Sequence, residues 1–97
     1  MRRKNTESIG EVLKQYFEEN LFLKRKIAES RIINGWEAIL GKTIASYTSH
    51  LYIRDGILHV SLRSSVLRSE LSMAKDNLIE KLNNYAGLVV VKDIILK

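Results

Sequence analysis

The sequence contains no cysteine, no proline and no apolar run long enough to cross a membrane. Without cysteine, disulfide bonds and thiolate metal sites are excluded, and a reducing compartment is expected. A transmembrane helix needs about 20 consecutive apolar residues. A secretory signal needs an apolar core, and none follows the basic start MRRKNTESIG. We therefore expect a cytoplasmic protein that neither enters nor binds a membrane.

Signatures of catalysis are also missing. The sequence has no P-loop and no glycine-rich dinucleotide fingerprint, and no carboxylate pair or Ser/His/Asp spacing stands out. His50 and His59 are a candidate metal pair for an enzyme, but a metal site needs a third ligand and none is obvious nearby. Solvent-facing strand residues are the simpler interpretation. We therefore expect a non-enzymatic protein without a cofactor, a metal or a small-molecule ligand.

The chain does have a globular composition and an excess of positive charge. Hydrophobic residues make up 45% of the 97 residues, which indicates a single folded domain over residues 1–97. Lysine and arginine number 16 against 11 acidic residues, so the formal net charge is +5. A basic protein favours a polyanionic partner, such as nucleic acid, an anionic membrane or an acidic protein.

Two helices are expected in the N-terminal part, residues 8–41, behind a flexible basic tip at residues 1–7. Ser8 and Glu11 have the spacing of a capping box. Apolar residues then recur at helical spacing, and Asn20 is the expected end of the first helix.

The second helix is expected at about residues 21–40. Gly41 would supply its left-handed stop, whereas Gly35 is a weak point inside it because glycine costs about 1 kcal/mol relative to alanine. Trp36 lies on the apolar stripe of this helix and is expected in the core.

A β-hairpin is expected around Asp55-Gly56, because this dipeptide is the strongest short hairpin signal. Its register gives one apolar face and one polar face, and a slip of one residue would exchange them. The apolar pairs would be Ile53–Leu58, Leu51–Val60 and Ser49–Leu62. The outer pairs would be Tyr52–His59, His50–Ser61 and Thr48–Arg63.

A third helix and a last strand complete residues 42–97. Ser64 or Ser65 would cap the helix, Gly87 would close it, and the β-branched LVVVKDIILK reads as a strand. The order helix-helix-strand-strand-helix-strand predicts an α+β fold, with a three-stranded sheet and helices on one face. If the second and last strands are parallel, a right-handed crossover is favoured.

Three groups of polar and basic residues are candidates for contact with nucleic acid. The residues are Arg2, Arg3 and Lys4 in the tip; Lys24, Arg25, Lys26 and Arg31 on the second helix; and Arg63, Ser64, Ser65 and Arg68 at the start of the third helix. A helix start offers free N–H groups to a phosphate. A solvated helix face and ordinary serine capping are the alternatives. Tyr52 would either stack on an unpaired base or support a cross-strand contact.

The run WEAILGKTIASYTSHLYIRDGILHVSLRSSVLRSEL, followed by LIEKLNNYAG, resembles the bacterial DciA family of replicative helicase loaders. The resemblance covers about residues 30–96. It rests on Trp36 before Leu40-Gly41, Thr48 before the first strand, Asp55-Gly56 with Leu58 and Val60, Ser64-Ser65, and Glu70-Leu71.

The resemblance implies a KH-like fold, binding of single- or double-stranded DNA, and contact with the replicative helicase. A KH module clamps nucleic acid with a Gly-x-x-Gly loop, but Leu71-Ser72-Met73-Ala74 stands here instead, so basic side chains and helix starts would make the contact. Longer family members carry an extension implicated in helicase contact. In this chain the apolar faces of the N-terminal helices would serve instead, and a protein–protein adaptor without nucleic acid is the alternative function.

Overall fold

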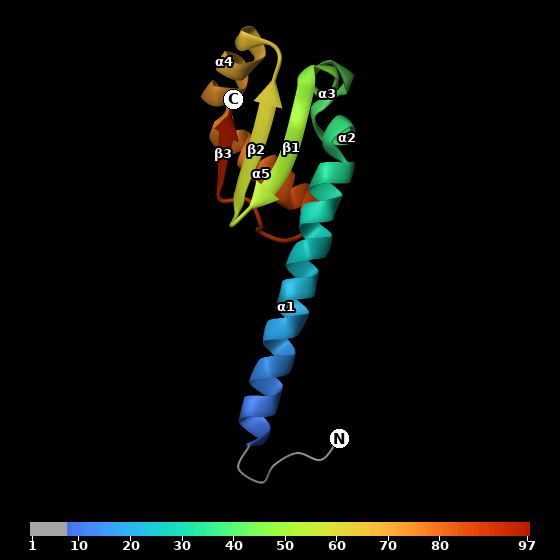
Figure 1. Cartoon of the computed structure of the whole chain (residues 1–97), viewed down its shortest axis with the longest axis vertical. Helices are drawn as coiled ribbons and strands as arrows, with labels where there is room; N and C mark the ends of the chain where they lie inside the picture. Colours follow the sequence, from blue (N-terminus) through green and yellow to red (C-terminus); the bar gives the residue numbers. More distant parts are fainter. Residues whose placement is uncertain (1–7) are drawn as a thin grey trace.

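The computed structural model describes residues 8–97, which form five helices and one three-stranded sheet (Figure 1). The described part measures 61 × 20 × 20 Å, because the first helix projects far beyond the rest. The order is α1 (Ile9–Asn34), α2 (Trp36–Leu40), α3 (Lys42–Tyr47), β1 (Thr48–Arg54), β2 (Ile57–Leu62), α4 (Ser65–Met73), α5 (Lys75–Ala86) and β3 (Asp93–Leu96). The predicted α+β class is confirmed.

Helix α1 is one continuous helix of 26 residues, so the predicted end at Asn20 is wrong. Asparagine has only a modest helix-propensity cost, and no glycine or proline follows it to break the hydrogen-bond ladder. The predicted start is confirmed. The Ser8 hydroxyl accepts from the Glu11 N–H at 3.1 Å, and the Ser8 N–H donates to the Glu11 carboxylate at 3.0 Å.

Gly35 is the joint between α1 and α2, so the prediction of one helix through this glycine to residue 40 is wrong. Its N–H still donates to the Arg31 carbonyl, at 2.9 Å, and Trp36 opens the next helix. Gly41 has φ 95° and ψ 164°, a conformation open to glycine but rare for other residues. It turns the chain into α3, a short helix that the sequence pattern did not reveal.

The hairpin forms as predicted over most of its length. Asp55 and Gly56 have φ values of 53° and 80°, as a type I′ turn requires. The pairs Ile53–Leu58, Leu51–Val60, Tyr52–His59 and His50–Ser61 are all present. Beyond them a bulge pairs Thr48 with Leu62, so the predicted pairs Ser49–Leu62 and Thr48–Arg63 are wrong. A bulge adds one residue to one strand and shifts the register from that point.

The predicted third helix is divided at Ala74 into α4 and α5. Ser64 caps α4 by accepting from the Leu67 N–H at 3.2 Å, and Gly87, in the left-handed region, closes α5. The last strand is confirmed but shorter than the apolar run suggests, since β3 covers only Asp93–Leu96. It pairs parallel with β2, which gives the sheet order β1-β2-β3.

The core lies between one face of the sheet and the helices, with α5 behind the sheet in Figure 1. The residues with almost no exposed surface are Ile32, Leu58, Leu82, Ile94, Val60 and Val91. Trp36 is buried as predicted, and its indole N–H donates to the Thr48 hydroxyl at 3.0 Å. Within residues 8–97, no helix covers the outer face of the sheet (Figure 1). None of the helices described is long and apolar enough to span a membrane.

Candidate nucleic-acid interface

The outer face of the sheet carries a stacked aromatic pair. Tyr52 on β1 and His59 on β2 are direct cross-strand partners, and their rings lie 4.4 Å apart at an angle of 6°. The Lys97 ammonium lies 5.9 Å from the centre of the Tyr52 ring. Tyr52 remains 44% exposed, so part of its aromatic surface is open to solvent next to a positive charge.

Further cations lie along the same face, because residues two apart on a strand share a face. Arg54 follows Tyr52 on β1. At the opposite end of the strand, the Arg63 guanidinium lies 6.0 Å from the centre of the Tyr47 ring and donates to the Ser46 carbonyl. A strip therefore runs along the outer face from Arg54, over the Tyr52–His59 pair, to Arg63.

The start of α4 is held largely by contacts within the protein. The Ser64 hydroxyl accepts from the Leu67 N–H, and the Arg68 guanidinium donates to the carbonyls of Leu62 and Lys97. Ser65 is exposed in the first turn. These contacts agree with the alternative in which Ser64 simply caps α4. The predicted site residues Arg63 and Arg68 both donate hydrogen bonds to backbone carbonyls. Binding of a phosphate at this helix start stays a prediction.

The basic residues of α1 do not form a single face. Arg25 and Lys26 line a cavity of about 380 Å³ together with the hairpin turn and Lys92. Lys26 also forms an ion pair with Glu29 at 3.6 Å. Arg31 points elsewhere, because its guanidinium donates to the Ala86 carbonyl at the end of α5, at 3.1 Å.

The predicted groups are thus distributed over the molecule. Arg25 and Lys26 lie beside the hairpin turn, and Lys24 precedes them on α1. Beyond the other end of the sheet, near the start of α4, lie Arg63, Ser64, Ser65 and Arg68 (Figure 1). The outer face links the two ends. A groove of about 390 Å³ between α1 and β1 is lined by both Lys26 and Tyr52. The predicted residues Arg2, Arg3 and Lys4 lie outside the described residues.

The two histidines have different surroundings. His59 stacks on Tyr52, and its Nδ1 atom is buried without a hydrogen-bond partner. His50 pairs across the hairpin with Ser61. Within residues 8–97, no three histidine, aspartate or glutamate side chains lie together as a metal site would require.

Three cations of this surface were not among the predicted site residues: Arg54, Lys92 and Lys97. The period-2 pattern of the hairpin places Arg54 beside Tyr52 on the outer face, so Arg54 could have been predicted from the sequence. No sequence pattern indicates the positions of Lys92 and Lys97. Lys97 reaches Tyr52 because β3 pairs with β2, and Lys92 reaches the α1 cluster because its N–H donates to the Gly56 carbonyl at 2.7 Å.

Comparison with known proteins gives both a family and a set of relatives. The family model described as "Dna[CI] antecedent, DciA" matches residues 8–96. A UPF0232 protein of Rhodococcus jostii is 30% identical over 69 residues, which is 71% of this chain and 37% of the relative. A "UPF0232 protein in recF-gyrB intergenic region" of Mycolicibacterium smegmatis is 29% identical over 66 residues, 68% of this chain and 34% of that protein.

The chain therefore spans less than two-fifths of the length of these curated relatives. No solved structure gives a significant match, so the KH-like character of the fold stays a prediction. The family match covers α1, the hairpin, α4, α5 and β3, and includes every residue on which the sequence resemblance rests. The chain belongs to the DciA family.

Proposed function

We propose that this chain is a non-enzymatic, DNA-binding accessory protein of bacterial replication that helps to load or operate the replicative helicase in the cytoplasm. Membership of the DciA family supports the role in replication. The net charge of +5 supports a polyanionic partner.

The observation that carries DNA binding is the exposed ring of Tyr52, which stacks on His59 on the outer face of the sheet. Proteins that bind single strands combine a positive track for the backbone with aromatic side chains on which bases stack, each stack being worth about 1–3 kcal/mol. Here Tyr52 would receive a base, while Lys97, Arg54 and Arg63 would lie near the flanking phosphates. Only an unpaired base presents its flat surface to such a ring, so a single strand is the preferred ligand.

The groove between α1 and β1 provides a route for the strand to leave the stack. Its walls carry Tyr52 on one side and Lys26 on the other. Lys26 also borders the cavity that contains Arg25 and Lys92. A strand that follows this groove would pass from the aromatic pair to the basic cluster of α1.

The test is fluorescence anisotropy with labelled single-stranded and duplex oligonucleotides over a salt series. We expect tighter binding of the single strand and a steep loss of affinity with salt, since phosphate contacts release counterions. Tyr52→Ala should weaken binding about fivefold or more. Tyr52→Phe is the matched control, because it keeps the aromatic ring on which a base would stack and should bind nearly as well as the native chain. Absence of binding at low salt, or equal affinities for the native chain and Tyr52→Ala, would contradict the proposal.

A second candidate function is a protein–protein adaptor that uses α1. The observation in its favour is the number of large apolar side chains that α1 exposes, among them Leu13, Tyr16 and Leu23, each at least 50% exposed. Exposed apolar surface of this extent on a small protein indicates an interaction site. Isothermal titration with the purified replicative helicase tests this function, and absence of a binding signal would contradict it for that partner.

A further inference from the structure

Helix α1 carries an apolar seam that the protein itself leaves uncovered. The seam consists of Ile9, Leu13, Tyr16, Asn20, Leu23 and Ile27, which follow one another at alternating steps of four and three residues. This spacing is the a/d pattern of a coiled coil. Its five apolar members are each 50–79% exposed.

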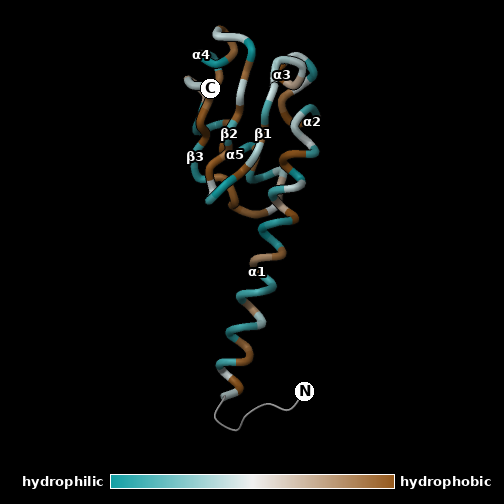
Figure 2. Tube along the Cα trace, in the orientation of Figure 1, coloured by the Kyte–Doolittle hydropathy of each residue, from teal (hydrophilic) through white to brown (hydrophobic). Residues whose placement is uncertain are grey.

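The seam is separate from the part of α1 that forms the core. The core uses Ala28 and Ile32, near the end of the helix, and both are buried. Most of the seam lies on the part of α1 that projects from the body of the protein, which consists of the sheet, helices α2–α5 and the end of α1 (Figures 1 and 2). Helices owe most of their stability to packing of an apolar face. The projecting helix therefore has a face for packing that the body does not cover.

We propose that the seam pairs with the same seam of a second copy of this chain, with the two α1 helices antiparallel. Charge complementarity supports this occupant. The first half of α1, residues 9–20, has three glutamates and one lysine: Glu11, Glu18, Glu19 and Lys14. The rest of the seam, residues 21–27, has three basic residues and no acidic residue: Lys24, Arg25 and Lys26. An antiparallel pair places each acidic half beside a basic half, whereas a parallel pair places like charges together.

The seam also has a register that suits an antiparallel pair. When the twofold axis lies at the level of residue 18, every a position faces a d position of the partner, and Glu18 itself lies on the face of α1 away from the seam. Ile9 then faces the partner's Ile27, and Leu13 faces the partner's Leu23. Tyr16 faces the partner's Asn20, so the one amide in the seam meets the one hydroxyl. The twofold axis produces this polar layer twice, and polar layers of this kind specify the register of a coiled coil at some cost in stability.

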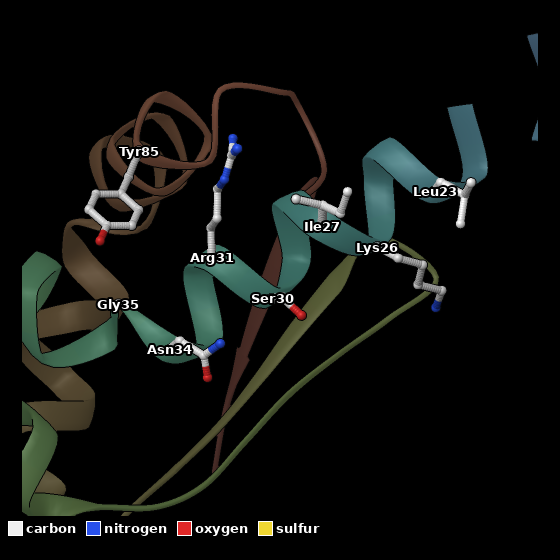
Figure 3. Close-up of a pocket in the computed structure, with 8 residues that line it drawn as sticks. All are labelled: Leu23, Lys26, Ile27, Ser30, Arg31, Asn34, Gly35 and Tyr85. Atoms are coloured by element: carbon white, nitrogen blue, oxygen red, sulfur yellow. The ribbon is translucent and has the colours of Figure 1, made fainter. Parts of the chain in front are cut away.

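The antiparallel arrangement leaves room for the two bodies. They lie at opposite ends of a shared stretch of 19 residues, about 28 Å long. Each helix start reaches the other copy at Ile27, where the seam leads into a groove of about 500 Å³ (Figure 3). Leu23, Ile27 and Tyr85 supply its apolar wall. Since the shared seam is short, we expect association at micromolar to hundreds-of-micromolar concentrations.

The mass of the full chain in solution tests the proposal by sedimentation equilibrium up to several hundred micromolar. We expect a concentration-dependent shift from 11.2 kDa to twice this mass. Leu13→Glu with Leu23→Glu should raise the dissociation constant roughly tenfold or more. Leu21→Glu is the matched control, because Leu21 is an exposed leucine of α1 outside the seam and should leave dimerisation nearly unchanged.

Folding of the body is checked by fluorescence of Trp36, the one tryptophan, which is buried away from the seam. Its emission should be the same in all variants. A chain that stays monomeric at every concentration overturns the proposal. So does a dimer that both seam substitutions leave intact, or one that Leu21→Glu disrupts equally.

Cysteine crosslinking tests the orientation, since the native chain has no cysteine to interfere. A mixture of Leu13→Cys and Leu23→Cys chains should form a mixed disulfide under mild oxidation, because these positions face each other in the antiparallel pair. Either variant alone should crosslink poorly, as residue 13 is about 15 Å along the axis from residue 13 of the second copy. Efficient crosslinking of each single variant with itself would overturn the antiparallel arrangement. The outcome is independent of DNA binding, which the anisotropy experiment tests separately.

Discussion

Tyr85 of α5 packs so closely on Gly35 that a Cβ atom at residue 35 would lie 2.6 Å from the Tyr85 Cε1 atom and 2.7 Å from its hydroxyl. The same Cβ atom would lie 2.8 Å from the Arg31 carbonyl oxygen. Gly35 is also the joint at which α1 ends and α2 begins. The absence of a side chain here therefore lets the projecting helix dock against α5.

Gly35→Ala should destabilise the protein by about 1–3 kcal/mol, the usual cost of an extra methyl group in a packed site. Thermal unfolding followed by circular dichroism measures the change. Gly10→Ala is the control, because its Cβ would meet only the Ser8 hydroxyl at 3.7 Å, and alanine favours the helix. If Gly35→Ala is as stable as the native chain or more stable, the Tyr85 side chain can move to accept the extra methyl group, and the prediction is wrong.

Asn83→Leu should lower the free energy of unfolding by about 2–4 kcal/mol. The Asn83 carboxamide accepts from the Val90 and Val91 N–H groups, at 3.0 and 2.9 Å, and donates to the Val91 carbonyl at 2.9 Å. Each backbone group left unpaired at this partly buried position costs about 1–3 kcal/mol.

Chemical denaturation measures this loss, and Asn84→Leu provides the comparison at the neighbouring exposed position of α5. The Asn84→Leu chain should unfold near the native midpoint. If both leucine variants lose the same stability, the hydrogen bonds to residues 90 and 91 are not its source.

The start of α1 should fray in acid. The backbone N–H and hydroxyl of Ser8 hold the pKa of the Glu11 carboxyl below its ordinary value of 4.5. A carboxyl whose pKa is lowered by folding stabilises the folded form above its unfolded pKa. This contribution is therefore lost as the pH falls from about 4.5 through the lowered pKa.

Amide exchange at residues 9–12, measured by NMR from pH 6 to pH 3, should report the fraying of this first turn. Glu11→Gln keeps a capping-box side chain but does not titrate, so its exchange should lack the extra acid-dependent step. An identical step in the Glu11→Gln chain would assign it to another group.

Arg25→Ala with Lys26→Ala should reduce affinity for single-stranded DNA and flatten its salt dependence. For a single strand, each lost phosphate contact lowers the salt slope by about 0.7. Lys42→Ala with Lys81→Ala removes the same net charge at exposed positions on α3 and α5 and should leave the slope nearly unchanged. Anisotropy titrations at several salt concentrations compare the pairs. Equal slopes in both would exclude the α1 cluster from the DNA site.

Local signals in the sequence predicted the parts of the fold whose causes are local. The capping box at Ser8 and Glu11, the turn at Asp55-Gly56 and the hairpin register all depend on residues a few positions apart. The helix joint at Gly35 was missed, because its reason is a contact with Tyr85, 50 residues later. The sequence pattern does not predict the break at Ala74 either, because the helical spacing of apolar residues continues across it.

In the candidate site, too, only the features with local causes could be predicted from the sequence. Alternation along β1 and β2 placed Tyr52 and His59 on the outer face, but only the parallel pairing of β3 with β2 brings Lys97 over Tyr52. Their positions on the predicted helices make Arg31 and Arg68 candidates for contact with nucleic acid. Helical spacing does not predict the backbone carbonyls to which these arginines donate, which belong to Ala86, Leu62 and Lys97.

The sequence by itself determined the α+β class, the hairpin with its two faces and the resemblance to the DciA family, because periodicity, turn chemistry and motif spacing are all properties of the chain. Only the tertiary structure decided which apolar residues are buried. Ile32 and Leu13 occupy equally regular positions on one helix, yet the first is fully buried and the second is 50% exposed. The reason is physical: burial depends on where the sheet and α5 end, and the projecting part of α1 extends beyond both.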